Sequence, residues 1–183
     1  EDKPSLAIDV QFDCVNPEEI EKIFGVKEVD KASAIIWTTT PWTLPANEAI
    51  SVNPKFQYGL YKCKNNFLIL ADELADIKFK AYDLSATKVA TCNGSDLEGV
   101  LFSHPFIEKT VPIICGDHVT TETGTGLVHT APAHGLDDYI VGIKYNLPVE
   151  NPVDAKGKFK NNILYFSGLT VWEANPKVID ILK

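Results

Sequence analysis

The chain has 183 residues, a length that suits one domain with its own hydrophobic core. With 45% hydrophobic and 23% charged residues it has an ordinary globular composition, and no apolar run is long enough to cross a bilayer. Its formal net charge is -8 and all seventeen basic residues are lysine, which argues against a surface that grips nucleic acid broadly. Any nucleic acid is therefore expected to be held locally, or by another part of a longer protein.

Cysteine usage and the start of the sequence point to an intracellular piece of a longer protein. The chain has no methionine, begins with Glu1 and shows no secretory leader, so we expect that it was cut from a longer polypeptide. Its four cysteines form no CxxC pair, which favours free thiols in a reducing cytosol over a zinc site or a disulfide framework. They are Cys14, Cys63, Cys92 and Cys115. We expect a cytoplasmic protein without a metal site.

Hydrophobic patterning predicts many short strands. Runs of apolar and β-branched residues predict strands over residues 5–15, 32–39, 49–52, 57–62, 67–71, 87–92 and 111–115. The segment 64–66 predicts a hairpin turn between two of these strands. Because Pro41 and Pro45 disfavour regular structure, residues 41–47 are predicted to form an ordered loop.

Helical spacing is less common in the sequence. Residues 16–19 predict a turn or the start of a short helix, and residues 72–82 predict a helix capped by Asp72. Further helices are predicted from the aspartates at 137 and 138 to about residue 146, and over residues 174–182, where Pro176 could interrupt the helix. Residues 151–159 are rich in turn formers. Many short strands with a few inserted helices predict a mixed α/β (α+β), barrel-like domain rather than alternating βαβ units.

The most unusual stretch of the first half is WTTTPWTLPAN, residues 37–47. Threonines favour strands and prolines end them, so structure alone explains part of this pattern. Two tryptophans, four threonines and two prolines in eleven residues nevertheless exceed what ending a strand requires. Hydroxyl groups at fixed positions after a buried strand suit a pocket for a small polar ligand.

The second unusual stretch is GTGLVHTAPAHGLDDY, residues 124–139. Turn glycines lead into a short apolar strand ending at His129 and Thr130, and a Pro/Gly elbow then leads to Asp137 and Asp138 at a helix start. This order brings an imidazole, a hydroxyl and two carboxylates close together, as in a ligand site. Structural explanations stay open, because aspartates in a first helical turn stabilise the helix dipole and a histidine at a strand end can be a core residue.

These stretches, with GDHVT at residues 116–120 between them, closely resemble the editing domain of bacterial-type isoleucyl-tRNA synthetases. The motifs have the same order and spacing, and the resemblance covers essentially residues 1–183. Valyl and leucyl relatives carry arginine, proline and an acidic residue after the paired threonines, whereas Thr40, Pro41 and Trp42 stand there in this chain. The resemblance therefore favours the isoleucyl type and implies a single β-barrel-like editing domain with inserted helices, a fragment of a larger synthetase.

The resemblance also implies a set of site residues. Asp138 would be the key acid that pairs with the α-ammonium group of the substrate, whereas Asp137 would have a minor, structural role. His129 would line the amino-acid pocket and exclude the extra methyl group of isoleucine. Thr39 and Thr40 would border this pocket, hold the terminal adenosine or the attacking water, and form the catalytic set with Asp138. The other implied substrate-binding residues are Trp37, Thr38, Thr43 and Asn47.

The implied reaction is post-transfer editing, in which valine wrongly esterified to tRNA(Ile) is hydrolysed, with valyl-adenylate as an additional substrate to consider. The HIGH-like and KMSKS-like signatures of the synthetic domain are absent from the sequence. ATP and Mg²⁺ would therefore belong to the missing synthetic domain, and no cofactor is expected in this one. The expected partners are the 3′ acceptor end of tRNA(Ile) and the rest of the synthetase, with a monomer as the default state and no membrane.

Several alternatives stay open. The chain could be a module that only docks the acceptor end of tRNA, which suits its acidic balance and its lack of arginine, or the editing domain of a valyl or leucyl relative. A free-standing editing protein is a third alternative, against which the missing start residue speaks. No Ser-His-Asp arrangement stands out, so direct attack by water is favoured over a covalent nucleophile.

Three further expectations concern single residues. Ala133 stands where the family usually has glycine, and a position that needs φ > 0 would be strained by alanine and could shift Asp138. Ordinary aromatic burial favours packing of Trp37 behind its strand over contact with ligand. His104 and His118 lie outside both motifs and are expected to have structural or surface roles.

Overall fold

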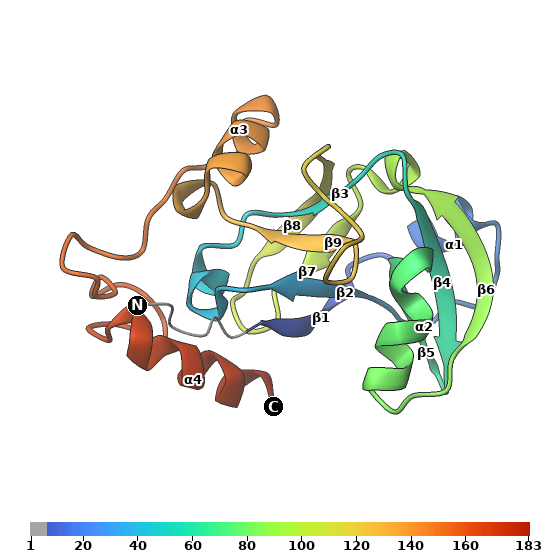
Figure 1. Ribbon diagram of the computed structural model, residues 1–183, viewed down its shortest axis with the longest axis horizontal. Helices are drawn as coiled ribbons and strands as arrows, with labels where there is room; N and C mark the ends of the chain where they lie inside the picture. Colours follow the sequence, from blue (N-terminus) through green and yellow to red (C-terminus); the bar gives the residue numbers. More distant parts are fainter. Residues whose placement is uncertain (1–6) are drawn as a thin grey trace.

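The computed structural model describes residues 7–183, and over this range nine strands form one continuous sheet (Figure 1). Six of them, in the order β1-β7-β8-β3-β9-β2, close into a barrel because β1 also pairs with β2. This confirms the predicted mixed α/β, barrel-like fold. The barrel strands are β1 (Ile8–Cys14), β2 (Ala32–Thr38), β3 (Ala49–Val52), β7 (Leu101–Ser103), β8 (Thr110–Cys115) and β9 (Leu127–Thr130).

The sheet branches at β2. One edge of this strand pairs antiparallel with β1 along its length. The other edge is shared, because its first residues run parallel to β5 (Asn66–Ala71) and Trp37 pairs in parallel with Val128 of β9. Beyond β5 the sheet continues through β4 (Gln57–Cys63) to β6 (Thr87–Asn93), away from the barrel (Figure 1). Neighbouring strands bond to both edges of β2, and the strand is almost entirely buried. Accordingly, most of its residues are apolar.

Helix α1 (Pro17–Phe24) begins and ends with the signals that its sequence carries. The side chain of Asn16 accepts a hydrogen bond from the Glu18 N–H, and Pro17 occupies the first helical position. The helix ends at Gly25, whose φ of 68° lies in the left-handed region that favours glycine. The predicted short helix start at this place is confirmed.

Helix α2 (Asp72–Ala81) begins differently from the prediction. Asp72 does not cap the helix, since Ala71 holds the cap position and Asp72 is the first helical residue. The Asp72 carboxylate instead accepts hydrogen bonds from the Tyr61 hydroxyl at 2.7 Å and from the Lys88 ammonium at 3.1 Å. The carboxylate therefore connects α2 to β4 and β6. It forms no hydrogen bond to the free N–H groups in the first turn of the helix.

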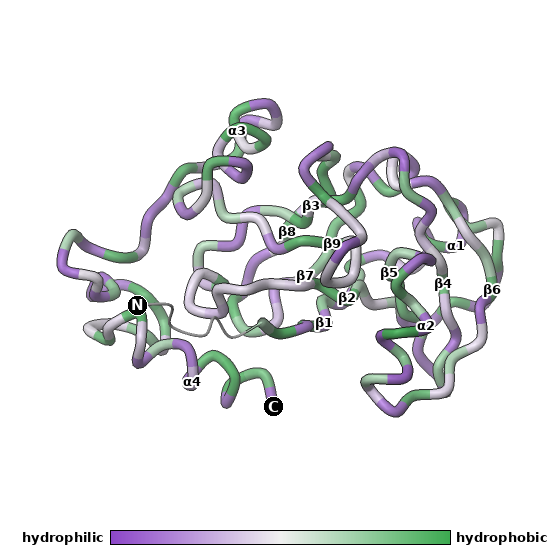
Figure 2. The backbone as a smooth tube through the Cα atoms, in the orientation of Figure 1, coloured by the Kyte–Doolittle hydropathy of each residue, from purple (hydrophilic) through white to green (hydrophobic). Residues whose placement is uncertain are grey.

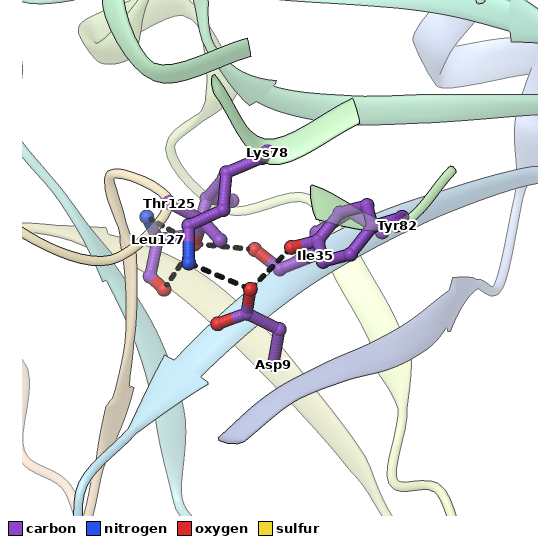
Figure 3. Close-up of polar contacts among 6 residues, drawn as sticks. All are labelled: Asp9, Ile35, Lys78, Tyr82, Thr125 and Leu127. Atoms are coloured by element: carbon purple, nitrogen blue, oxygen red, sulfur yellow. Dashed lines mark hydrogen bonds and ion pairs between the residues drawn. The ribbon is translucent and has the colours of Figure 1, made fainter. Parts of the chain in front are cut away.

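A second polar contact fixes α2 against the barrel (Figure 3). The Lys78 ammonium lies 2.8 Å from the carboxylate of Asp9 on β1, and both side chains are mostly buried. The Tyr82 hydroxyl donates to the same carboxylate oxygen. Burial of a charge is costly unless it is paired, so this triad stays together only while α2 and β1 are in place.

The proline-rich stretch after β2 is more regular than predicted. Residues Pro41–Ala46 form a short 3-10 helix, η1, where an ordered loop without regular structure was predicted. Pro41 suits the first position because its φ is fixed and it has no N–H to satisfy. The N–H groups of Thr43 and Asn47 donate to the carbonyl groups of Thr40 and Leu44, at 2.9 and 3.0 Å. The segment that carries the first motif is therefore an ordered turn.

The C-terminal part of the chain adds α3 (Leu136–Lys144) and α4 (Val171–Leu182), which lie outside the barrel (Figure 1). Helix α4 begins earlier than predicted because Thr170 accepts from the Glu173 N–H and caps it, and it continues through Pro176 without a break. Figure 2 shows both hydrophobic and hydrophilic residues in α3, where Val141 is buried and Leu136 is 75% exposed. No helix within residues 7–183 is long and apolar enough to span a membrane.

The remaining differences from the predicted elements are small. Strand β7 and the 3-10 turn at Gly94–Leu97 were not predicted, and Ser5 and Leu6 of the first predicted strand lie outside the described residues. The turn-rich segment 151–159 is confirmed, since Val153 and Phe159 form an antiparallel bridge. All four cysteines are free, as predicted.

Thr125 joins the start of β9 to the middle of β2 (Figure 3). Its side chain is fully buried, and its hydroxyl donates to the Ile35 carbonyl at 2.6 Å while it accepts from the Leu127 N–H at 3.3 Å. A buried carbonyl without a hydrogen-bond donor lowers the stability of the fold, so the Thr125 hydroxyl stabilises the protein by donating to the Ile35 carbonyl.

We expect Thr125→Val to lower the free energy of unfolding by about 1–3 kcal/mol, because valine keeps the shape and leaves the Ile35 carbonyl unpaired. Urea denaturation followed by circular dichroism measures the change. Thr120→Val at an exposed position is the matched control and should change stability by less than about 0.5 kcal/mol. Equal effects of the two substitutions would contradict the role given to the hydroxyl.

Candidate active site

The two sequence motifs meet at one edge of the barrel. Strands β2 and β9 run parallel and are joined by the pair Trp37↔Val128, so their carboxyl ends lie side by side. The threonines that follow Trp37 therefore lie near His129, which follows Val128. Strand β3 pairs antiparallel with β9 through Ile50↔His129. This pairing brings Asn47, just before β3, to the same place.

His129 is buried, and both of its ring nitrogens have partners. Nδ1 lies 2.6 Å from the side-chain nitrogen of Asn47, and Nε2 lies 2.7 Å from the hydroxyl of Thr43. The Asn47 nitrogen also donates to the Ala49 carbonyl at 3.1 Å, so it is the amide NH₂ group and Nδ1 must accept. The proton of the ring is then on Nε2, which donates to Thr43. Burial, with smaller effects from His104 and His134, lowers the pKa of His129 to about 3, so the ring is neutral.

The hydroxyl groups of the first motif continue this network. The Thr43 hydroxyl donates to the Thr40 carbonyl at 2.7 Å and lies 3.0 Å from the Thr40 hydroxyl. Thr38 is buried and its hydroxyl accepts from the Thr40 N–H at 3.1 Å, whereas Thr39 is half-buried. The structure thus joins Thr40, Thr43, Asn47 and His129 in one hydrogen-bonded group.

Trp37 is half-buried and packs against the glycine that opens the second motif. A Cβ atom on Gly124 would lie only 2.8 Å from the Trp37 ring, and the φ of Gly124 is 83°. Both the left-handed backbone and the close approach of the Trp37 ring therefore require glycine at position 124. The ring of Trp37 therefore lies against the loop before β9.

Asp138 lies in the first turn of α3 and is held against the end of β9. Its Oδ2 atom accepts from the Ala131 N–H at 3.0 Å, and the side chain is half-buried. Burial raises the pKa of the Asp138 carboxyl, whereas the Ala131 N–H and the nearby His118 oppose this rise and Asp137 adds to it. Over residues 7–183 Asp138 forms no hydrogen bond to the threonine and histidine group. Its partner Ala131 directly follows Thr130, the last residue of β9, whereas Asp138 itself lies eight residues beyond the end of this strand.

The neighbours of Asp138 have other positions. Asp137 is exposed and lines a hollow of about 320 Å³ together with Gly116 and His118. The elbow residues Pro132–His134 form a 3-10 turn, η3, and Ala133 is not among the residues with positive φ. The expected strain at Ala133 is therefore absent, because this elbow does not use the left-handed region at that position.

His104 has the structural role expected of it. It is buried, and its Nε2 atom lies 2.7 Å from the Leu44 carbonyl. Its Nδ1 atom accepts from the N–H groups of Phe106 and Ile107 at 3.2 and 3.1 Å. The ring thus joins the loop after β7 to the end of η1.

Sequence reasoning did not single out Trp42 and His134, which join the two motifs. Their rings meet edge to face with 5.1 Å between the centroids. Two polar atoms of this region are buried without a hydrogen-bond partner in residues 7–183, namely Oδ1 of Asn47 and Nε2 of His134. Such atoms can bind water or a polar ligand group. Trp42 and His134 both lie inside the two motifs, and this position could have indicated them from the sequence.

The fold and the motifs have known counterparts. Over residues 19–171 the chain matches the family described as leucyl-tRNA synthetase, editing domain. The isoleucine–tRNA ligases of Nitrosomonas europaea and Dechloromonas aromatica are 48% and 51% identical to it over 100% of the chain. That of Coxiella burnetii is 49% identical over 99% of the chain. The chain spans only 20% of the length of each of these relatives.

Solved structures show the same fold. The crystal structure of GlLeuRS-CP1 is similar with a TM-score of 0.75 and 17% identity, covering 97% of this chain and 95% of that one. The editing domain of the P. knowlesi cytosolic leucyl-tRNA synthetase is similar with a TM-score of 0.70 and 14% identity, covering 95% and 92%. The residues matched by the family, 19–171, include both motifs. The chain therefore belongs to the leucyl-tRNA synthetase editing-domain family, and its relatives at about half identity are isoleucine–tRNA ligases.

Proposed function

We propose that this domain hydrolyses the ester that joins a wrong amino acid to tRNA, and that its substrate is valine on tRNA(Ile). A hydrophobic pocket distinguishes isoleucine from valine, one methylene smaller, by only about 1–3 kcal/mol, a magnitude taken as known for isoleucyl-tRNA synthetases. A second, smaller site that hydrolyses valyl esters supplies the missing selectivity. The observation that carries the proposal is the hydrogen-bonded threonine–histidine group beside an acid at the edge of β2 and β9 in a chain of this family.

Asp138 has the features of an anchor for the α-ammonium group of the substrate. One carboxylate oxygen is held by the Ala131 N–H, which fixes the orientation of the carboxyl group. The other oxygen forms no hydrogen bond within residues 7–183, and it is not among their buried unpartnered atoms, so it faces solvent. A charge-assisted bond from the ammonium group to this oxygen would place the ester carbonyl without a covalent bond to the protein.

The threonine and histidine group has the features of a rigid wall. His129 is neutral, so it does not compete with the substrate ammonium for the Asp138 carboxylate, and its ring cannot rotate without breaking two hydrogen bonds. Thr43 and Asn47 hold the ring, while Thr39 and Thr40 border the pocket and hold the terminal adenosine or the attacking water. Thr38 and Trp37 support this edge from behind.

Direct attack by water is the proposed chemical step, because the group contains no serine or cysteine beside the histidine. Positioning of the ester and water supplies the rate, and the fixed wall supplies the selectivity. The proposed partners are the 3′ end of tRNA(Ile) and the rest of the synthetase, with the domain acting as a monomer in the cytoplasm. No cofactor takes part in this step, since ATP and Mg²⁺ serve the synthetic domain.

We expect Asp138→Asn to lower the rate of valyl-tRNA(Ile) deacylation roughly 10- to 100-fold, because asparagine still accepts from the Ala131 N–H but loses the charge that binds the ammonium group. Release of labelled valine from the tRNA measures the rate, in the full-length protein and in the 183-residue chain. Asp137→Asn is the matched control and should keep most of the activity.

Each other outcome of this experiment has a meaning. Equal losses in the two variants would show that the acid has been assigned to the wrong residue. Hydrolysis of isoleucyl-tRNA(Ile) as fast as that of valyl-tRNA(Ile) would contradict the substrate, and a trapped aminoacyl-protein would contradict attack by water. Binding of tRNA without hydrolysis by any preparation would favour a docking module, which the acidic balance of the chain makes the second candidate.

We expect the His129 ring to stay neutral from pH 8 to pH 5, so its NMR resonances should not titrate in this range. Its pKa falls from an ordinary value of 6.5 to about 3 in the folded protein, so the unfolded chain binds the extra proton between these values. Stability should therefore fall as the pH falls below 6.5. His129→Gln should reduce the loss between pH 7 and pH 5 by about 2 kcal/mol, as measured by urea denaturation. An unchanged pH dependence would mean that the pKa of His129 in the folded protein is close to its ordinary value of 6.5.

A further inference from the structure

The C-terminal helix reaches the first motif through one side chain. Asn175, in the second turn of α4, accepts a hydrogen bond from the Trp42 N–H at 3.0 Å, across 133 residues of sequence. Its neighbours Ala174 and Val178 are fully buried, so this face of the helix packs firmly. Asparagine is a poor helix former, and here its amide group points out of the helix to another segment.

The Trp42 N–H has no partner within its own segment. It belongs to the second residue of η1, where N–H groups point away from the helix and need an outside acceptor. Pro41 has no N–H, and the Thr43 N–H is already bonded to the Thr40 carbonyl. The side-chain oxygen of Asn175 is therefore the cap of η1, although it comes from the far end of the chain.

The same residue, Trp42, contacts the second motif through its ring. The edge-to-face contact with His134 joins η1 to the elbow that leads into α3. Because Thr43 directly follows Trp42 and bonds to His129, a shift of the Trp42 backbone would move the hydroxyl that holds the histidine. One hydrogen bond from α4 thus acts on both halves of the candidate site.

We propose that Asn175 is a positioning residue for the hydrolysis: its side-chain oxygen fixes the Trp42 backbone, and through it the threonine and histidine wall and the elbow before Asp138. This inference rests on the proposed function. It assigns to α4, a helix outside the barrel, a part in aligning the ester for attack by water.

The test replaces the acceptor and then restores it. Asn175→Leu has a similar size and cannot accept, whereas Asn175→Asp keeps an oxygen at the same place. Asp180→Leu is the matched control, because Asp180 lies on the same helix, has a side chain that is 75% exposed and forms an ion pair with Lys183. All variants are made in the full-length protein, and thermal unfolding checks that each is folded.

Two readouts separate this inference from the proposed function. Hydrogen exchange of the Trp42 amide should be roughly tenfold faster in Asn175→Leu, and near the unsubstituted rate in Asn175→Asp and Asp180→Leu. Deacylation of valyl-tRNA(Ile) should show kcat lowered roughly tenfold in Asn175→Leu with KM within about twofold, and recovery in Asn175→Asp.

Unchanged exchange of the Trp42 amide would overturn the proposed contact, whatever the activity. Faster exchange with unchanged kcat in an active protein would overturn the positioning role and leave a structural one. If the unsubstituted protein hydrolyses no aminoacyl-tRNA, the proposed function fails and the positioning role fails with it, while the exchange rates still decide whether Asn175 caps η1.

Discussion

The whole arrangement depends on the parallel pairing of β2 with β9 through Trp37 and Val128. Parallel strands place their carboxyl ends at the same edge, so two motifs that are ninety residues apart in sequence come together there. The pairing is short, and Thr125 strengthens it through its bond to the Ile35 carbonyl. Since β2 is also bonded to β1 and β5, it cannot shift to accommodate a loose partner.

The polar group at this edge is rigid because every member restricts the next. Asn47 is oriented by the Ala49 carbonyl, and its orientation makes Nδ1 of His129 an acceptor. The ring proton is then on Nε2, which donates a hydrogen bond to the Thr43 hydroxyl, and this hydroxyl donates in turn to the Thr40 carbonyl. These hydrogen bonds fix both ring nitrogens of His129, although Oδ1 of Asn47 is buried without a partner in residues 7–183.

The sequence predicted the elements that carry strong local signals. The buried strand around Trp37, the hairpin of β4 and β5 and the cap of α1 all follow from apolar runs, turn residues and Asn16. The three-residue strand β7 has too few residues to show a pattern, and η1 was missed because two prolines hide a 3-10 turn that tolerates them. For the candidate site, the motifs include Thr40, Thr43, Asn47 and His129, which hydrogen bonds join in the structure, whereas Asp138 is bonded to Ala131 instead. The bond from Asn175 to the Trp42 N–H is set by tertiary packing and has no local signal.

The branching of the sheet at β2 has a consequence for the order in which the chain folds. The hairpin β4–β5, strand β6 and α2 lie within residues 57–93 and can form from local contacts. The barrel closes only when β9 reaches β2 and β3, which requires loops of many residues to close first. During synthesis, strands β4, β5 and β6 and helix α2 would therefore be structured before the edge with both motifs has formed. That edge would be complete only after α4 has been synthesised. We therefore expect the edge that carries both motifs to be the last part of the fold to form.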